Sequence, residues 1–109
     1  MRMTESDFNA AAEMTLAAIA RSLEESGADC DAGFKGDGVL ELEFEDGGRI
    51  IVNRHSAAQE IWVAAKSGGF HFRFDGARWV NTRDATELFA ALSQLVGEHC
   101  GHAVALRGQ

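Results

Sequence analysis

Carboxylates make up most of the residues in this chain that could do chemistry. Glu24 and Glu25 end a predicted helix, and Asp29 and Asp31 lie on one side of the strand predicted after it, so we expect these four to converge as an acidic ridge. Oxygen donors of this kind suit hard cations, although no preformed cage such as a calcium-binding loop is present. The sequence therefore indicates weak, adaptable cation binding, with a merely solvated acidic face as the alternative.

The charge of the chain is divided unevenly. The net charge is −7, with residues 1–48 summing to −9 and residues 49–109 to +2. A strongly acidic field repels phosphate backbones and anionic lipid, so nucleic acids and membrane surfaces are excluded as expected partners. Cations and basic protein surfaces are favoured instead.

Sulfur and imidazole groups give a weaker signal. Cys30 and Cys100 match neither a disulfide framework nor a zinc-site spacing, so we expect free thiols. His99, Cys100 and His102 could bind a soft metal, but neighbouring helical residues point in different directions and a fourth ligand is missing. No nucleophile, base and orienting group can be assembled, and we do not expect an enzyme.

Two amphipathic helices are predicted to bracket the chain. Thr4 and Asp7 suit the start of a helix over residues 5–25, and Gly27 suits its end. A second helix is predicted from Asp84 to about His99, ending at Gly101. Their apolar stripes comprise Phe8, Ala12, Leu16, Ile19 and Leu23 in the first helix, and Ala85, Leu88, Leu92, Leu95 and Val96 in the second.

Between the helices the apolar period changes to two, which is typical of strands. The alternating sets are Cys30, Ala32 and Phe34; Leu40, Leu42 and Phe44; Ile50 and Val52; Ile61, Val63 and Ala65; and Phe70, Phe72 and Phe74, with a sixth strand expected around Trp79. Short links that contain glycine, at residues 35–38, 45–48, 66–69 and 75–77, make the strands that they join antiparallel neighbours. We therefore predict one α+β domain over residues 1–109, a two-layer α-β sandwich whose antiparallel sheet of five to six strands carries both terminal helices on one face.

The same parity predicts which side chains face away from the helices. They are Glu41, Glu43, Glu45, Arg49, Ile51, Asn53, Glu60, Trp62, Ala64, His71, Arg73 and Asp75. Trp62 is the exception on this polar face, because tryptophan is costly to leave in water and commonly anchors protein interfaces. The alternative is that a bulge turns Trp62 into the core or that it only covers neighbouring aliphatic stems.

Several of these stretches resemble the frataxin family, in its bacterial CyaY type, over nearly the whole chain. The most specific run is Ile50-Ile51-Val52-Asn53-Arg54, then Gln59-Glu60-Ile61-Trp62-Val63-Ala64-Ala65, then Gly68-Gly69-Phe70-His71-Phe72. Ser6-Asp7-Phe8, Gly38-Val39-Leu40 and Phe44-Glu45-Asp46-Gly47 also match. The chain departs from the bacterial pattern at Asn9, Ala20, Arg21 and Ser56-Ala57.

The resemblance implies an α-β sandwich and a role in iron–sulfur cluster assembly. It implies weak binding of ferrous and ferric iron, and of other divalent cations, by Glu24, Glu25, Asp29 and Asp31, with Glu13 and Asp37 as further candidates. It also implies docking on a cysteine desulfurase and its scaffold protein through Asn53, Gln59, Trp62 and Arg73. A metal-independent interaction module and an iron-storing ferroxidase oligomer are the alternatives.

The start of the chain bears on localisation. Met1 to Asp7 is polar and acidic, unlike a secretory or mitochondrial targeting segment, and no apolar run approaches the ~18 residues of a membrane span. We expect an unprocessed cytoplasmic protein, monomeric unless iron promotes an oligomer.

Overall fold

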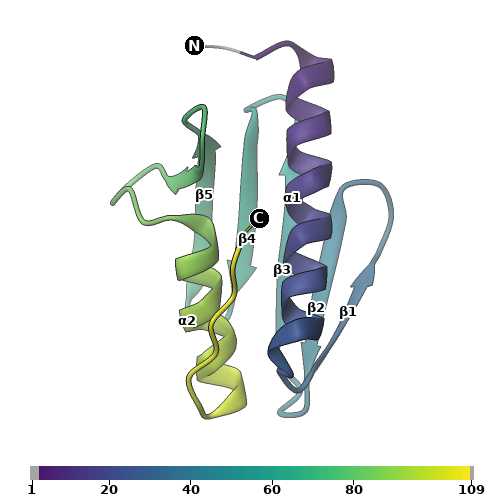
Figure 1. Cartoon of the computed structure of the whole chain (residues 1–109), viewed down its shortest axis with the longest axis vertical. Coiled ribbons are helices and arrows are strands. Elements are labelled where there is room, and N and C mark those ends of the chain that lie inside the picture. The colour runs from purple at the N-terminus through teal and green to yellow at the C-terminus, as the bar shows by residue number, and fades with distance from the viewer. Residues whose placement is uncertain (1–2, 109) are drawn as a thin grey trace.

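The computed structural model describes residues 3–108 and shows one antiparallel sheet covered by two helices (Figure 1). The elements are α1 (Glu5–Ser26), β1 (Cys30–Phe34), β2 (Val39–Phe44), β3 (Arg49–His55), β4 (Glu60–Ala65), β5 (Gly68–Phe74), β6 (Trp79–Asn81) and α2 (Leu88–Cys100). Strand order in the sheet follows chain order from β1 to β6, and every neighbouring pair is antiparallel. The predicted two-layer α+β sandwich is confirmed.

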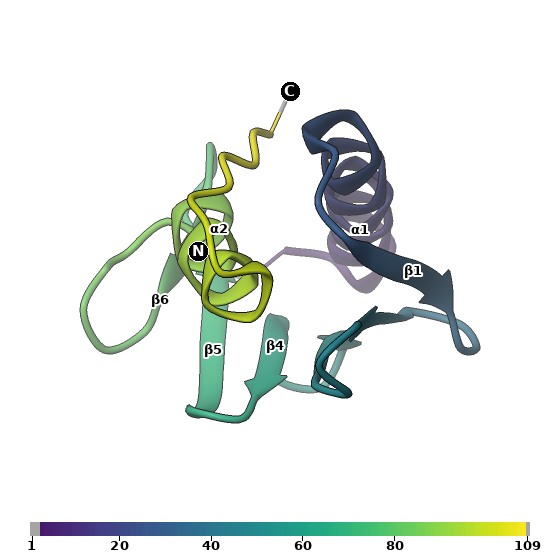
Figure 2. The ribbon, with the colours of Figure 1, turned by 90° about the horizontal axis from the view of Figure 1, so that it is seen from below.

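Both helices lie on one face of the sheet, and we call the other the open face (Figure 2). Most of the apolar residues predicted to face the helices on the central strands are fully buried, including Leu42, Val52, Ile61 and Phe72 at 0% exposure. Ala65, Phe70 and Phe74 are only partly buried but pack against the same core. Their neighbours in sequence face the other way, so the predicted parity is confirmed there. Neither helix in the described chain has the length and apolarity needed to cross a membrane.

The first helix begins and ends where its capping residues predict. The Thr4 hydroxyl accepts a hydrogen bond from the Asp7 amide at 3.0 Å, which satisfies one of the free N–H groups of the first turn. Gly27 adopts a left-handed conformation with φ 73°, which glycine tolerates without a steric cost. No basic residue lies in the last turn of α1.

The predicted start of the second helix is wrong by about one turn. The helix begins at Leu88, with Glu87 as its N-cap, and Asp84 lies in the preceding turn, where its carboxylate accepts from the Thr86 amide. Ala85, predicted on the apolar stripe, is exposed and has φ 63°. Asn81 and Thr86 pair through their backbones, so the chain cannot become helical until this turn is complete.

The C-terminal tail runs back from the end of α2 on the helical side of the molecule (Figure 1). Leu106 is buried at 5% exposure within the core. Its amide donates to the Ser93 hydroxyl of α2, and the Arg107 amide donates to the Ser22 hydroxyl of α1. The tail therefore ties the two helices together.

The edge strand β1 departs from the predicted apolar pattern. Ala32 is exposed and Phe34 is 56% exposed, although both alternate with Gly33 as expected. Because β1 pairs only with β2 and lies at the margin of the sheet, its far end extends beyond the cover of α1. Cys30, the first residue of β1, packs partly against the core.

Candidate metal and partner-binding sites

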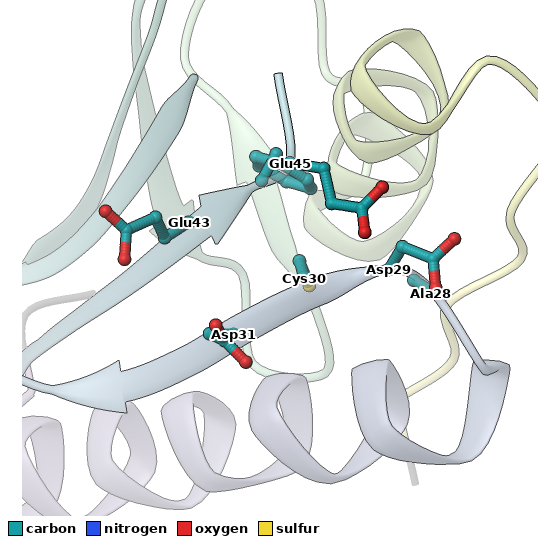
Figure 3. Close-up of a pocket in the computed structure, with 7 residues that line it drawn as sticks. Ala28, Asp29, Cys30, Asp31, Glu43 and Glu45 are labelled. Atoms are coloured by element: carbon teal, nitrogen blue, oxygen red, sulfur yellow. The ribbon is translucent and has the colours of Figure 1, made fainter. Parts of the chain in front are cut away.

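An open acidic hollow of about 490 Å³ lies where β1 begins beside the end of β2 (Figure 3). We call it the acidic hollow; it is lined by Ala28, Asp29, Cys30, Asp31, Glu43, Phe44 and Glu45. Asp31 and Glu43 are directly opposed across the two strands, and like charges so placed repel one another. Arg49, at 3.4 Å from Glu43, offsets this only through an exposed pair. The hollow can attract a cation.

Carboxylate oxygens are the metal ligands available in this hollow, because its thiol stays protonated. Burial raises the pKa of Cys30, and the neighbouring Cys100, Asp31 and Asp29 raise it further. A protonated thiol is a poor metal ligand, since the thiolate is the binding form. The hollow therefore suits hard cations rather than soft ones.

The four ridge residues are brought to one end of the molecule but not to one point. Asp29 and Asp31 line the acidic hollow, whereas Glu24 and Glu25 are exposed on the last turn of α1. Within residues 3–108 no three metal-ligating side chains converge closely enough to hold one ion. Neighbours that the sequence did not predict, Glu43 and Glu45, complete the hollow in place of the two helical residues.

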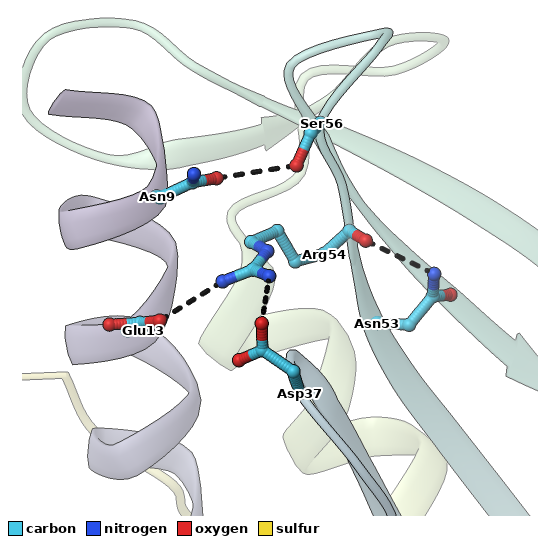
Figure 4. Close-up of polar contacts among 6 residues, drawn as sticks. All are labelled: Asn9, Glu13, Asp37, Asn53, Arg54 and Ser56. Atoms are coloured by element: carbon cyan, nitrogen blue, oxygen red, sulfur yellow. Dashed lines mark hydrogen bonds and ion pairs between the residues drawn. The ribbon is translucent and has the colours of Figure 1, made fainter. Parts of the chain in front are cut away.

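Glu13 and Asp37 lie apart from the hollow and are both paired with one arginine (Figure 4). Arg54 donates to Glu13 at 3.0 Å and to Asp37 at 2.9 Å, and its own side chain is only 13% exposed. These bonds raise the pKa of Arg54, chiefly through Asp37. A cation at Glu13 and Asp37 would have to displace the Arg54 guanidinium, so neither carboxylate is free for a metal in this structure.

Trp62 lies on the open face, as parity predicted, but neither face of its ring is bare. His55 stacks on the indole with ring centroids 3.7 Å apart, and His71 stacks with centroids 4.4 Å apart. We call His55, Trp62 and His71 the histidine sandwich. The indole N–H donates to Glu60 at 2.7 Å. Trp62 is half-buried by these neighbours and has not turned into the core.

The other predicted docking residues divide into two groups. Asn53 is the cross-strand partner of Trp62, and Arg73 is the partner of Glu60, so both border the histidine sandwich on the open face. Gln59 does not belong with them. Its φ of 54° takes it out of the strand pattern, and both atoms of its amide bond the backbone of Met3. Gln59 ties the start of the chain to the β3–β4 turn.

One contact between distant parts of the chain was not predicted at all. His99, with its side chain 2% exposed, bonds the Asp46 carboxylate at 2.8 Å and stacks on Phe44 with centroids 4.4 Å apart. The same carboxylate accepts from the Gly48 amide at 2.7 Å, and these two bonds lower the pKa of Asp46. His99 therefore joins the end of α2 to the β2–β3 turn and has a structural role within the described chain, rather than belonging to a metal cluster.

Residues 1–102 match the model of the frataxin-like domain. The chain belongs to the frataxin family. Among its relatives, the iron–sulfur cluster assembly protein CyaY of Dechloromonas aromatica is 55% identical over 105 residues, covering 96% of this chain and 100% of that protein. The CyaY of Herminiimonas arsenicoxydans is 56% identical over 110 residues, covering 96% and 97%. The family to which this chain belongs takes part in iron–sulfur cluster assembly.

Solved frataxins confirm the fold. The frataxin of Psychromonas ingrahamii superposes with a TM-score of 0.89 at 28% identity, covering 97% of this chain and all of that one. A trimeric frataxin from the yeast Saccharomyces cerevisiae, complexed with ferrous, has a TM-score of 0.65 at 23% identity, covering 93% of this chain and 89% of the yeast chain. The frataxin architecture thus accounts for the sheet, both helices and the placement of the open face.

Proposed function

We propose that this frataxin binds iron weakly at its acidic ridge and docks on a cysteine desulfurase and its scaffold protein to regulate or supply iron–sulfur cluster assembly. The family and the names of the curated CyaY relatives support the pathway. The yeast frataxin complexed with ferrous supports iron as the metal. Carboxylates alone supply the ligands, so the cation stays exchangeable.

One observation carries the iron-binding half of the proposal, namely the uncompensated negative charge where α1 ends and β1 begins. The negative end of the α1 dipole coincides with Glu24 and Glu25, and its last turn contains no base. Directly after it come Asp29 and Asp31, with Asp31 facing Glu43. Because each of these charges raises the energy of the others, a bound cation stabilises the folded chain.

The spacing of the ligands determines the expected strength. Flexible, exposed carboxylates that do not converge on one point bind less tightly than a preformed cage, so we expect dissociation constants on the order of 10⁻⁶ to 10⁻³ M. Other divalent cations should compete. Metal at ~100 times the dissociation constant should add roughly 2.7 kcal/mol to the free energy of unfolding per independent site.

Anaerobic ferrous titration followed by residue-resolved NMR tests this half. We expect changes confined to the acidic ridge and the acidic hollow, and at least a tenfold loss of affinity in the Glu24→Gln/Glu25→Gln/Asp29→Asn/Asp31→Asn variant. A matched pair separates position from net charge: Asp29→Asn/Asp31→Asn should weaken binding, whereas Glu5→Gln/Asp7→Asn, which removes the same charge from exposed sites at the opposite end of α1, should not.

The alternatives make different forecasts in the same experiments. Unchanged iron affinity and metal-dependent melting in the quadruple variant would mean that the ridge is only a solvated face, which favours a metal-independent interaction module. Oxygen consumption with turnover would identify a ferroxidase instead. The docking half is tested by affinity for a purified desulfurase–scaffold complex, which Trp62→Ala should lower.

A further inference from the structure

The histidine sandwich is assembled by register rather than by sequence proximity. Trp62 on β4 lies opposite His71 on β5 and Asn53 on β3, while His55 lies one pair further along β3, opposite Glu60. The two imidazoles lie nearly parallel to the indole, at 14° and 9°. A partner that reaches Trp62 on the open face therefore meets two imidazole rings at the same time.

One carboxylate organises this group. The same oxygen of Glu60 accepts the Trp62 indole N–H at 2.7 Å and lies 3.5 Å from Nδ1 of His71. Its side chain is only 21% exposed, whereas that of His71 is 49% exposed. On the opposite side, Nδ1 of His55 accepts from the Ala58 amide at 3.3 Å. Each imidazole ring is thus oriented by a contact at its Nδ1 atom.

The charges around the sandwich are mixed. Arg73, opposite Glu60, borders it on β5, and Arg83 lines a small hollow together with His71 after β6. Glu60 is the one acid in the rows that hold the sandwich on β3, β4 and β5, and Asp75 follows two residues after Arg73, where its carboxylate accepts from the Ala77 and Arg78 amides. By contrast, the same face of β2 carries Glu41 and Glu43 with Glu45 beyond. The open face is therefore strongly acidic on β2 and evenly charged around the sandwich.

We propose that the histidine sandwich is a proton-sensitive docking surface that takes a carboxylate-bearing segment of a protein partner. Histidine changes charge between about pH 5 and pH 8. When His71 is protonated, it places a cation against the indole face, and cation–π attraction strengthens the stack. Nδ1 of His55 already accepts a bond from the Ala58 amide, and a proton there would break that bond, so His71 is the ring that carries the added charge. His71 also gains its attraction to Glu60. The protonated surface, with Arg73 and Arg83, then attracts partner carboxylates.

The inference deepens the docking half of the proposed function and rests on it. It differs from a simple tryptophan anchor in one measurable respect, because an indole does not titrate. Docking through Trp62 alone would have an affinity independent of pH at this surface. Docking through the sandwich should tighten as pH falls from about 8 to about 6.5.

The free protein gives the first test, with no partner present. NMR should show the indole N–H signal of Trp62 moving as pH is lowered from about 8 to about 5.5, while that of buried Trp79, bonded to Thr15, stays still. The Trp62 movement should vanish in His55→Gln/His71→Gln and persist in His102→Gln, an exposed histidine away from the sheet. A Trp62 signal that ignores pH, or one that still moves in the double variant, overturns the inference.

The second test uses a purified cysteine desulfurase–scaffold complex. We expect wild type and His102→Gln to bind at least about threefold more tightly at about pH 6.5 than at about pH 8, because the added positive charge faces the carboxylates of the partner. The His55→Gln/His71→Gln variant should lack this gain. Equal gains in all three proteins would overturn the inference while leaving docking intact, whereas no binding by any variant at either pH would mean that the proposed docking itself fails.

Sedimentation of the protein alone at about pH 6.5 completes the test. A monomer is expected. Association that requires His55 and His71 would show that the carboxylates come from the acidic ridge of a second copy, and it would overturn the assignment to a different protein.

Discussion

At the scale of single residues, Trp62 and Phe72 make a matched pair on neighbouring strands. Trp62 lies on the open face and contacts two imidazoles, whereas Phe72 is fully buried. Trp62→Ala should therefore lower the free energy of unfolding by about 1 kcal/mol or less, against about 3 to 5 for Phe72→Ala. Urea unfolding measures both.

The order of the two variants should reverse in a binding assay, where Trp62→Ala should lose more affinity than Phe72→Ala. Loss of an interfacial tryptophan commonly costs about 2 kcal/mol or more, which is over tenfold in affinity for the desulfurase–scaffold complex. A Trp62→Ala protein that unfolds as easily as Phe72→Ala, or that binds normally, would contradict the interface assignment.

Asp46 should contribute measurably to the loss of folding stability at acidic pH. Its pKa is lowered by the bonds from His99 and Gly48, so the folded state holds this proton less tightly than the unfolded state. The stabilisation is fully present above the ordinary aspartate pKa of about 3.9 and is lost as pH falls through the lower, folded-state pKa. Melting temperatures measured down to about pH 2 should therefore fall less steeply in Asp46→Asn than in wild type.

Asp75→Asn is an informative comparison for that experiment. The pKa of Asp75 is also lowered, but by backbone amides of Arg78 and Ala77 rather than by a histidine. Both variants should reduce the fall in melting temperature at acidic pH. Only Asp46→Asn should also loosen the end of α2, which amide exchange would show as faster exchange around His99. Equal exchange at His99 in the two variants would argue against this contact as the link.

Parity placed Trp62, Asn53 and Arg73 on the open face from sequence alone, because period two leaves a strand residue only two choices of side. It could not place Gln59, whose positive φ breaks the period. His55 was overlooked, although its parity with Asn53 was available. The contact between Asp46 and His99 joins residues 53 apart, and no local pattern encodes it.

At the scale of elements, the turn before α2 contains an alanine in a conformation that suits glycine. Ala85 has φ 63° and is exposed. Ala85→Gly should therefore raise the free energy of unfolding by roughly 0.5 to 1 kcal/mol, since relief of the left-handed strain outweighs the added freedom of the unfolded chain. Chemical denaturation measures it. Gly27→Ala, the reverse change at φ 73°, should destabilise, and a destabilised Ala85→Gly would contradict this account.

The C-terminal tail should contribute to stability through Leu106. This side chain fills the space between the helices at 5% exposure, so Leu106→Ala should cost about 2 to 4 kcal/mol. Val104, which is only half-buried in the same segment, gives a milder comparison, and Val104→Ala should cost less. Urea midpoints that are equal for the two variants would show that the tail does not pack as described.

Helix boundaries were predictable where the cap was unambiguous. Thr4 and Gly27 bound the first helix because each has one role available to it. Before the second helix, Asp84 and Glu87 are both capable caps, and the choice of Glu87 follows from the pairing of Asn81 with Thr86. That pairing depends on where β6 ends in the folded protein, and helix propensity alone does not predict it.

At the scale of the whole molecule, the uneven charge should govern association with a basic partner. The −9 of residues 1–48 raises the encounter rate, and salt screens it over ~8 Å at physiological strength. Stopped-flow association with the desulfurase should slow between about 50 and about 300 mM salt. Charge reversal at Glu24, Glu25, Asp29 and Asp31 should mainly lower the on-rate, and an effect confined to the off-rate would argue against steering.

The sheet whose strands follow chain order has a consequence for how the protein folds. Each strand pairs with the next one along the chain across a short turn, so the entropy of closing these loops is small. The distant closures are those of α1 onto the sheet, of His99 onto Asp46 and of the tail onto both helices. Hairpins can therefore form early in refolding, and we expect the docking of the helical layer, which completes the core, to set the rate.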